Sequence, residues 1–446
     1  MTRCRKGCDW GLSTASCLLL ILCCLLAFPQ PASSASVVDN ERISLDLGGD
    51  IKGRFYGIFP YEHLFMPEDP IAQASLLARA RLELSIADFI HISAHHQLAA
   101  EIFSGTLPLS GGLLGDGSGS TGPEALPMSW IAFDEGKPFQ LRGRIDRLSL
   151  RLRLSHIDIK VGRQPVSFGS TWFFTPLDLV APFGPTTIDR EYKPGVDALR
   201  ADFYLGTATQ ITAVAAYAGS WQLEGMVLAA NGRINLGLWD ISLFLGSVHK
   251  DFVAGLDATG SIGDFAVRAA ATFTVPPEDE DDEENSEPFF RIVFGGDYRT
   301  PFGLTVLAEV YYQSIGEIDP SRYLDFALSP RVTRGELWSM GHLYGAVSLA
   351  YEITPLISAN MAVTCNILDG SALLSPGLSW SISDNADLVF GAMFALGKKP
   401  ADIELTDLIR DDGSLITADD IGEVFKPRSE FGLMPQTAYL QINSYF

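Results

Sequence analysis

The feature that most constrains this chain is a long series of stretches in which apolar and polar residues alternate. From Ile43 onward, about eighteen such stretches of roughly ten to fifteen residues follow one another, and none has convincing helical periodicity. A period of two places successive side chains on opposite faces of a strand, so the sequence predicts an all-β protein. The approximate spans are 43–57, 73–87, 90–103, 142–155, 157–165, 195–206, 208–218, 223–236, 240–249, 251–261, 264–275, 289–299, 304–314, 340–353, 356–367, 371–382, 386–397 and 436–446.

The connections between these stretches alternate in length. Those that leave even-numbered strands are short, such as "TPFG" at 300–303 and "SDNA" at 383–386. Short turns on one rim and long loops on the other are typical of an outer-membrane barrel. We therefore expect residues 36–446 to form a transmembrane antiparallel up-and-down β-barrel of about 18 strands, with 16 as the alternative count. The long connections all leave odd-numbered strands, at 58–72, 104–141, 166–194, 276–288, 315–339 and 398–435.

The first 35 residues have the features of a secretory signal peptide. Basic residues come first, an apolar run follows from Cys17 to Phe28, and small residues end at Ala35. The apolar run is too short to span a bilayer as a helix. A lipid anchor at Cys23 or Cys24 is the alternative, but the preceding Ile and Leu do not supply the small residues that it requires. We predict a cleaved signal peptide over 1–35 and export to the outer membrane of a Gram-negative bacterium.

The charge balance bears on the partners of the protein. The chain has 54 acidic and 32 basic residues, a net charge of −22, which argues against nucleic acid as a partner. Many acids lie in predicted loops, above all in "PPEDEDDEENSEP" at 276–288. One interpretation is that the acidic outer loops, among them "DLIRDDGSLITADD" at 407–420, weakly bind divalent cations that bridge lipopolysaccharide phosphates. The expected partners are outer-membrane lipid, lipopolysaccharide, the barrel-assembly machinery and small solutes. The sequence does not determine whether the protein forms a homo-oligomer.

The alternation also predicts which side chains face the lumen. In "RLSLRLRL" at 147–154, the leucines share one face and the arginines share the other. A guanidinium that faces lipid at mid-depth costs roughly 2 to 4 kcal/mol, so the arginines are expected to face inward. These cations could pair with lumenal acids and keep the interior wet and rigid, or create a transverse field that selects solutes. The predicted basic wall comprises Arg79, Arg81, Arg147, Arg151, Arg153, Lys160 and Arg200, and the inward acids include Asp46, Glu83, Glu101, Asp158 and Asp202.

One predicted loop differs from the others in composition. Residues 166–194 are rich in proline and aromatic side chains and are too apolar to extend into water. We expect this loop to fold into the barrel mouth as a constriction loop. The residues expected to bury against the wall are Trp172, Phe173, Phe174, Leu177 and Phe183, and those expected to project into the passage are Asp178, Asp189, Arg190 and Glu191.

The same region carries a resemblance to known proteins. Over Gly162 to Arg200, "GRQ" ends a strand, an aromatic loop with "PLD" follows, and "IDREYKPGVDA" leads into the next strand. This block resembles porin-like and alginate-export-type outer-membrane barrels. The resemblance implies passive or facilitated passage through a pore of about eighteen strands.

The C-terminal residues "QTAYLQINSYF" have the alternation of a strand that ends in an aromatic residue. An open sheet edge in hydrocarbon leaves unpaired backbone groups, so the last strand is expected to pair with the strand near Ile43. The ending also resembles that of outer-membrane barrels, in which a terminal aromatic is recognised during insertion. Phe446, Ile442 and Leu440 fit that pattern, which implies that Phe446 is an insertion signal, and Ser444 departs from it.

These features together predict a porin-like channel for passive or facilitated diffusion of small polar or charged, including anionic, solutes. We predict no enzymatic activity, no catalytic residue, no cofactor and no metal. His91 and His95 would lie about 13 Å apart on one strand face, with His96 on the other, so the three cannot hold one ion. The acidic outer rim keeps a cation preference open. The alternatives are an outer-membrane lipid hydrolase and a structural or adhesive barrel with acidic surface loops.

Overall fold

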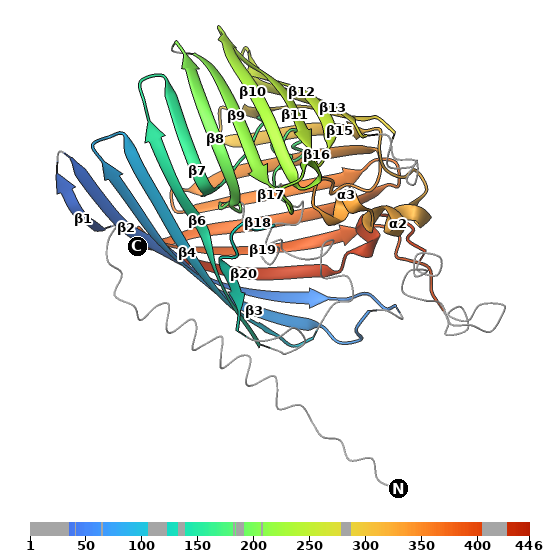
Figure 1. The fold of residues 1–446 in the computed structure, drawn as a ribbon. Coiled ribbons are helices and arrows are strands. Elements are labelled where there is room, and N and C mark those ends of the chain that lie inside the picture. The colour runs from blue at the N-terminus through green and yellow to red at the C-terminus, as the bar shows by residue number, and fades with distance from the viewer. Residues whose placement is uncertain are drawn as a thin grey trace.

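The strands form one antiparallel sheet that closes on itself (Figure 1). The computed structural model describes residues 35–40, 42–63, 66–105, 123–132, 139–181, 183, 191–206, 208–277, 287–403 and 426–446, so the predicted signal peptide lies outside the described residues except for Ala35. The predicted count of 18 barrel strands is confirmed. They are β2 (Ile43–Phe59), β3 (Ile71–Ile86), β4 (Ile90–Phe103), β6 (Phe139–Arg153), β7 (Ile157–Gln164), β8 (Val196–Leu205), β9 (Thr209–Tyr217), β10 (Met226–Leu236), β11 (Trp239–Val248), β12 (Asp251–Ile262), β13 (Phe265–Val275), β14 (Phe289–Arg299), β15 (Leu304–Gln313), β16 (Leu343–Thr354), β17 (Ile357–Asn366), β18 (Ser371–Ser383), β19 (Ala386–Leu396) and β20 (Gln436–Tyr445).

The barrel closes between its first and last long strands. β2 pairs with β20 from Asp50 opposite Tyr445 to Phe59 opposite Gln436. Gly49 and Phe446 then exchange two backbone hydrogen bonds, of 2.7 and 3.0 Å. The expected pairing of the last strand with the first is therefore confirmed. The start of β2, at 43–47, lies beyond the end of β20 and pairs instead with the short strand β1 (Ala35–Asn40).

Short turns and long loops lie on opposite rims of the barrel (Figure 1). Several tight turns have a residue with positive φ, as at Gly206, Gly237 and Gly263, a conformation that glycine adopts without steric cost. The long loop between β15 and β16 contains the short helices η2 (Pro320–Arg322), α2 (Tyr323–Ala327) and α3 (Pro330–Thr333). No helix in the described ranges is both long and apolar enough to cross a bilayer.

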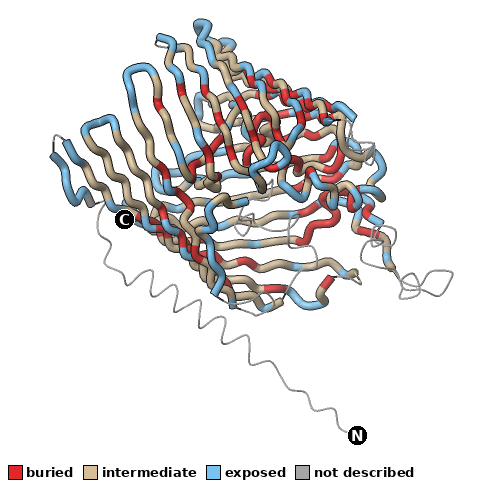
Figure 2. Tube along the Cα trace, viewed as in Figure 1, coloured by how far each residue is buried: buried red, intermediate tan, exposed pale blue. Residues whose placement is uncertain are grey.

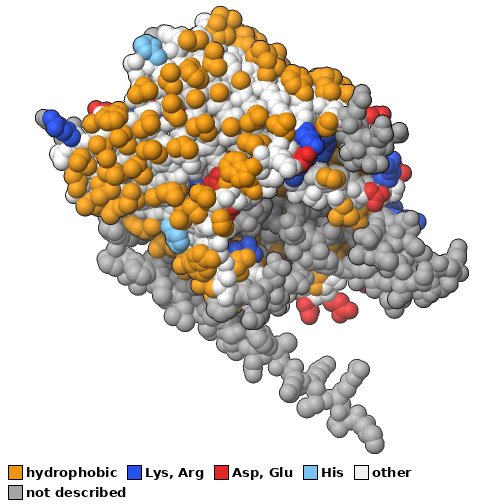
Figure 3. Space-filling view, in the orientation of Figure 1, with side chains coloured by type: hydrophobic (Ala, Val, Ile, Leu, Met, Phe, Trp, Pro, Cys, Tyr) orange, Lys and Arg blue, Asp and Glu red, His pale blue; other side chains and the backbone are white. Residues whose placement is uncertain are grey.

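The outward face of the barrel is apolar. Large side chains such as Leu199, Leu243 and Phe294 are exposed on it, although water would disfavour that exposure. Figure 3 shows hydrophobic side chains spread over the outer surface of the strands that face the viewer. An apolar belt around a closed sheet matches a hydrocarbon environment, in which every backbone group must be paired within the protein.

Many of the buried residues lie in the half of the barrel nearer the long loops (Figure 2). There the chain after β7 turns inward, and Val166, Leu177 and Val180 become buried. They join a cluster with inward residues of the wall, among them Ala216, Phe244 and Val293. This packing confirms the prediction that one loop folds into the lumen.

Candidate functional site: a constricted lumen

The constriction loop is fixed to the far wall by buried acceptors. The backbone N–H groups of Trp172, Phe173 and Phe174 donate to the Glu309 carboxylate of β15 at 2.7, 2.8 and 3.1 Å. Ser170 donates through its N–H and its hydroxyl to Asp257 of β12, at 3.0 and 2.9 Å. Because β15 lies eight strands along the sheet from β7, almost half the circumference, the loop crosses the lumen.

The aromatic part of the loop is placed only partly as predicted. Phe174 stacks on Tyr311 of β15 with ring centroids 4.8 Å apart, and Leu177 is buried. Phe173 and Phe183 are half-buried. The prediction for Trp172 was wrong, because its side chain is 60% exposed, with the Arg268 guanidinium 5.9 Å from its ring. The backbone N–H of Trp172 is held by Glu309, whereas its indole stays exposed.

The charged residues of the loop also divide into two groups. The expectation that Asp178 projects into the passage was wrong, because it is buried and forms an ion pair with Lys193 of the same loop. Burial raises the pKa of Asp178 and lowers that of Lys193, and their mutual attraction opposes both shifts. Glu191 is half-exposed and accepts from Lys52 of β2 at 2.6 Å. The predicted residues Asp189 and Arg190 lie outside the described residues.

The first part of the basic wall holds the base of the loop. The guanidinium of Arg79 lies 3.6 Å from the ring centroid of Tyr192, and that of Arg147 lies 5.4 Å from it. The Tyr192 hydroxyl lies 3.0 Å from Nδ1 of His95. Arg79 is 3.5 Å from Asp50, and Arg147 is 2.9 Å from Asp146. Both arginines are buried, so they support the loop more directly than they face the passage.

The rest of the basic wall forms a row across adjacent strands. Arg151, Lys160 and Arg200 are register partners on β6, β7 and β8, so three like charges lie side by side. Such neighbours repel each other unless acids intervene. Asp158 pairs with Arg151, and Asp202 pairs with Arg200 at 2.8 Å. Arg153 lies 4.0 Å from Asp158, and Arg81 donates to the Gly49 carbonyl at 3.2 Å.

Part of this inner wall is accessible to solvent. The side chains of Arg153 and Glu83 are 49% and 45% exposed, although their strand faces point away from the apolar belt. Charged groups retain their hydration in such positions and avoid the cost of burial. The inner wall therefore combines paired charges with solvent contact, which suits a passage for hydrophilic molecules.

Sequence reasoning missed a bulge and the charges that it brings inward. Opposite Arg147 and Ile145, β4 offers the consecutive residues His95 and His96, so Asp146 is an extra residue on β6. The bulge shifts the alternation, and Arg144 therefore shares the inner face with Arg147 and pairs with Asp146. The signal was present in "RGRIDR", because Arg142 and Arg144 have the opposite parity to Arg147.

A second missed residue, Arg163, closes a gap in the wall. β7 ends at Gln164, where the chain turns inward, while β6 continues for several more residues. The short strand β5 (Ser129–Ile131) pairs with the rest of that β6 edge. The arginine donates to the carbonyls of Ile145 at 3.0 Å and Leu126 at 2.9 Å. It also forms ion pairs with Glu124 at 2.8 Å and Asp197 at 2.9 Å, and all of its side chain is buried.

A closed antiparallel barrel of 18 strands, with an apolar belt, a charged inner wall and one infolded loop, has the architecture of a porin-type barrel. Solved outer-membrane porins share this fold. OccAB1 of Acinetobacter baumannii is 8% identical, with 93% of this chain and 99% of that chain covered and a TM-score of 0.53. OccK5 (OpdH) of Pseudomonas aeruginosa is 8% identical, with 90% and 97% covered and a TM-score of 0.52. No family model and no curated protein matches the sequence.

Proposed function

We propose that this protein is a porin-like channel through which small polar or charged solutes diffuse across the outer membrane. The observation that carries the proposal is the hydrated, charged inner wall inside a closed barrel whose outside is apolar. A sheet with this distribution of side chains is stable in lipid and presents a polar path through it. The loop anchored by Glu309 and Asp257 narrows that path and sets its bore.

The charges of the inner wall determine the ion selectivity that we propose for the channel. The row formed by Arg151, Lys160 and Arg200, together with the half-exposed Arg153, favours anions at the wall. The acids Asp158 and Asp202 reduce this preference without abolishing it, because the row still has more cations than acids. The resemblance of residues 162–200 to alginate-export-type barrels supports a role in facilitated passage of polar solutes.

The proposal includes a location and partners, and the apolar belt of the barrel supports the outer-membrane location. An N-terminal signal peptide over 1–35 directs export, and the apolar belt then contacts outer-membrane lipid, with lipopolysaccharide around the rim of long loops. The barrel-assembly machinery inserts the chain, and Phe446, which ends the closing strand, acts as its signal. The apolar belt is also compatible with a homo-oligomer, which crosslinking in native membranes would detect.

The experiment that tests the function is a single-channel recording of the refolded protein in planar bilayers under a salt gradient. We expect steady conductance with a reversal potential biased toward anions. Replacement of Arg151 and Arg153 by serine should weaken that bias, because both groups contact solvent in the lumen. The matched control is Arg322→Ser, which removes an exposed arginine of the β15–β16 loop that is paired with Glu317 at 3.2 Å.

Three outcomes are informative. An anion bias that falls in the double variant and stays in the control supports the channel and its basic wall. An unchanged bias in the double variant overturns the role of the wall and keeps the channel. Silent bilayers, with a barrel shown to be folded by its resistance to SDS before heating, would contradict the channel itself.

A further inference from the structure

A cavity of about 390 Å³ lies at the turn-side rim of the barrel, away from the constriction loop. It is formed by the ends of β14, β15, β16, β17 and β18 and by the tight turn between β16 and β17. Its volume lies within the range of about 300 to 1,000 Å³ that is common for small-molecule sites. This cavity plays no part in the constriction described above.

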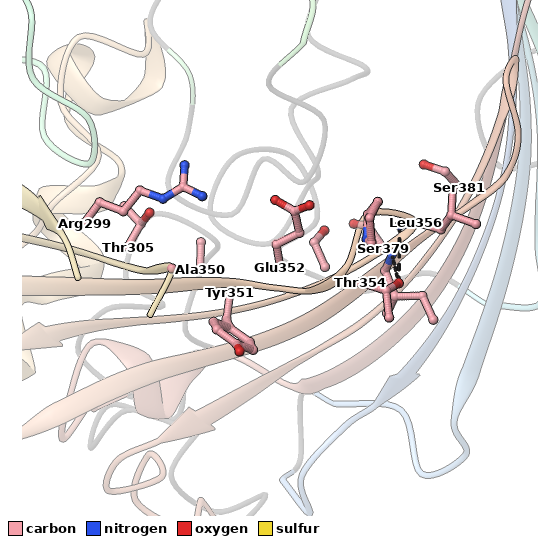
Figure 4. Close-up of a pocket in the computed structure, with 13 residues that line it drawn as sticks. Arg299, Thr305, Ala350, Tyr351, Glu352, Thr354, Leu356, Ser379 and Ser381 are labelled. Carbon is pink, nitrogen blue, oxygen red and sulfur yellow. Dashed lines mark hydrogen bonds between the residues drawn. The ribbon is translucent and has the colours of Figure 1, made fainter. Parts of the chain in front are cut away.

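The cavity has two opposite charges that are not used elsewhere in the described part of the chain. Arg299 ends β14 and Glu352 lies near the end of β16, and neither forms an ion pair with any described residue. Figure 4 shows the guanidinium and the carboxylate on the same side of the sheet, with Tyr351 pointing to the other side. Most other inward arginines have an acidic partner, as Arg268 has in Asp297, so this separated pair is unusual here.

The strand register determines the distance between the Cα atoms of Arg299 and Glu352. Arg299 is opposite Thr305, Thr305 is opposite Ala350, and Glu352 lies two residues beyond Ala350. Two strand spacings and two residues along the strand separate their Cα atoms by about 12 Å. Their flexible side chains can shorten this distance from both ends, which leaves room for a short molecule between them.

Hydroxyl groups fill the space around the two charges. Ser358 of β17 is the register partner of both Glu352 and Ser379, so the acidic side of the cavity continues as a polar shelf. Ser381 donates to Asp387 of β19 at 2.8 Å, which places a second carboxylate beyond that shelf. Thr354 is occupied, because its hydroxyl oxygen accepts the N–H groups of Leu356 and Ile357 at 3.3 and 3.1 Å. The cavity is therefore cationic toward β14 and anionic toward β16 to β19.

We propose that this cavity is a subsite for small zwitterionic solutes, whose carboxylate contacts Arg299 and whose ammonium group contacts Glu352. A solute with only one charge would satisfy one side and leave the other charge unpaired. The inference rests on the proposed function, because the subsite would hold a solute at the exit of the channel. It goes further by naming the class of solute and the residues that select it.

The test is a binding titration, so that it does not depend on conductance. Ligand-observed NMR with the folded barrel in detergent would use 5-aminopentanoate as the probe, with pentanoate and pentylamine as single-charge analogues. We expect weak saturable binding of the zwitterion that exceeds the binding of either analogue. Because both groups contact solvent, Arg299→Ser and Glu352→Gln should each weaken binding by about three- to fivefold.

Arg233→Ser is the matched control, because it removes another inward arginine near the same rim and lies outside the cavity. The control should bind the probe as the unchanged protein does. Equal binding of the three probes, or equal effects of Arg299→Ser and Arg233→Ser, would overturn the subsite. Binding without conductance would instead count against the channel alone, and conductance without binding would count against the subsite alone.

Discussion

The buried side chain of Arg163 holds together the part of the barrel wall between β6 and β8. Backbone hydrogen bonds hold most of the sheet, but the inward turn after β7 interrupts that ladder. Arg163 replaces the missing bonds with donors to two carbonyls and two carboxylates from three segments of the chain. An arginine is suited to this position because its planar fork presents five donors in fixed directions.

Arg163→Ala should therefore destabilise the barrel strongly. The change leaves Glu124 and Asp197 without their cation, and breaking a buried pair in this way costs about 3 to 5 kcal/mol. The measurement is the temperature at which the folded band disappears on an SDS gel, compared with Arg233→Ala. The control should change little, because an exposed ion pair contributes at most about 1 kcal/mol. Equal losses in the two variants would contradict the role given to Arg163.

At the scale of elements, the constriction loop is held by a few strong acceptors. The Glu309 carboxylate accepts hydrogen bonds from three consecutive backbone N–H groups. Each N–H group left buried without an acceptor would cost about 1 to 3 kcal/mol of stability. Apolar packing by Leu177 and Phe174 adds to the attachment. The loop is thus fixed both at its polar turn and along its apolar side.

Glu309→Ala should release the turn of this loop from the wall. We expect a larger and noisier single-channel conductance, because the segment around Trp172 loses its acceptor and fluctuates into and out of the passage. Glu224→Ala is the control, since Glu224 is an exposed acid that pairs with Lys250 near the loop rim. A conductance as quiet as that of the control would show that the Asp257 contacts and the apolar packing suffice to fix the loop.

A second loop element contains a buried acid, Glu430, beside which the described residues place no cation. Glu430 accepts from Tyr344 at 2.5 Å, from Asn366 at 2.8 Å and from the Met340 N–H at 3.3 Å. It thereby joins the β19–β20 loop to β16, β17 and the β15–β16 loop. Asp369, which accepts from the Glu430 N–H at 2.7 Å, adds a second carboxylate. Burial raises the pKa of Glu430 to about 7.

This raised pKa predicts that the loop is held more weakly as the pH rises. Protonated Glu430 stabilises the docked loop relative to the undocked loop. This stabilisation is fully present below the ordinary glutamate pKa of about 4.3 and is lost as the pH rises through about 7. Hydrogen exchange of residues 426–434 should be faster at pH 8 than at pH 5 after correction for intrinsic rates. Glu430→Gln should remove this difference, because its side chain does not ionise. A pH dependence that persists in this variant would assign the effect to another group.

The long strands were predictable, and the predicted span 304–314 compares with β15 at Leu304–Gln313, because lipid outside and water inside impose strict alternation. The strand β5 was not predictable, because it pairs with the part of the β6 edge that lies beyond the end of β7. The Asp178–Lys193 pair was not predictable either, because the fold of an irregular loop decides which of its charges meet.

Closure of the whole barrel depends on a close contact between Gly49 of the first long strand and Phe446, which follows the last strand. The Phe446 ring lies over Gly49, and a Cβ atom at this glycine would lie 2.5 Å from the ring and even nearer to the Arg79 carbonyl. The adjacent backbones exchange their last hydrogen bonds at the same place. The absence of a side chain at Gly49 therefore lets the final residue complete the ring of strands.

Gly49→Ala should impair closure, whereas Gly57→Ala in the same strand should not. At Gly57 the nearest atoms, in the Phe59 ring, lie 3.5 Å from the added carbon, an ordinary contact. The expected result is a smaller fraction of SDS-resistant barrel for Gly49→Ala, measured on unheated gels after refolding into lipid. If both variants refold equally well, the Phe446 ring and the Arg79 carbonyl can both move aside, and these contacts do not limit closure.

The inward turn after β7 has a mechanical consequence for the barrel. Most other neighbouring strands are joined by backbone bonds along most of their shared length, and those bonds share a load. Between β6 and β8, part of that load falls on Arg163 and on the short pairing of β5 with β6. If the barrel is pulled from one terminus by an atomic force probe, this seam should yield at a lower force than the hairpins on either side.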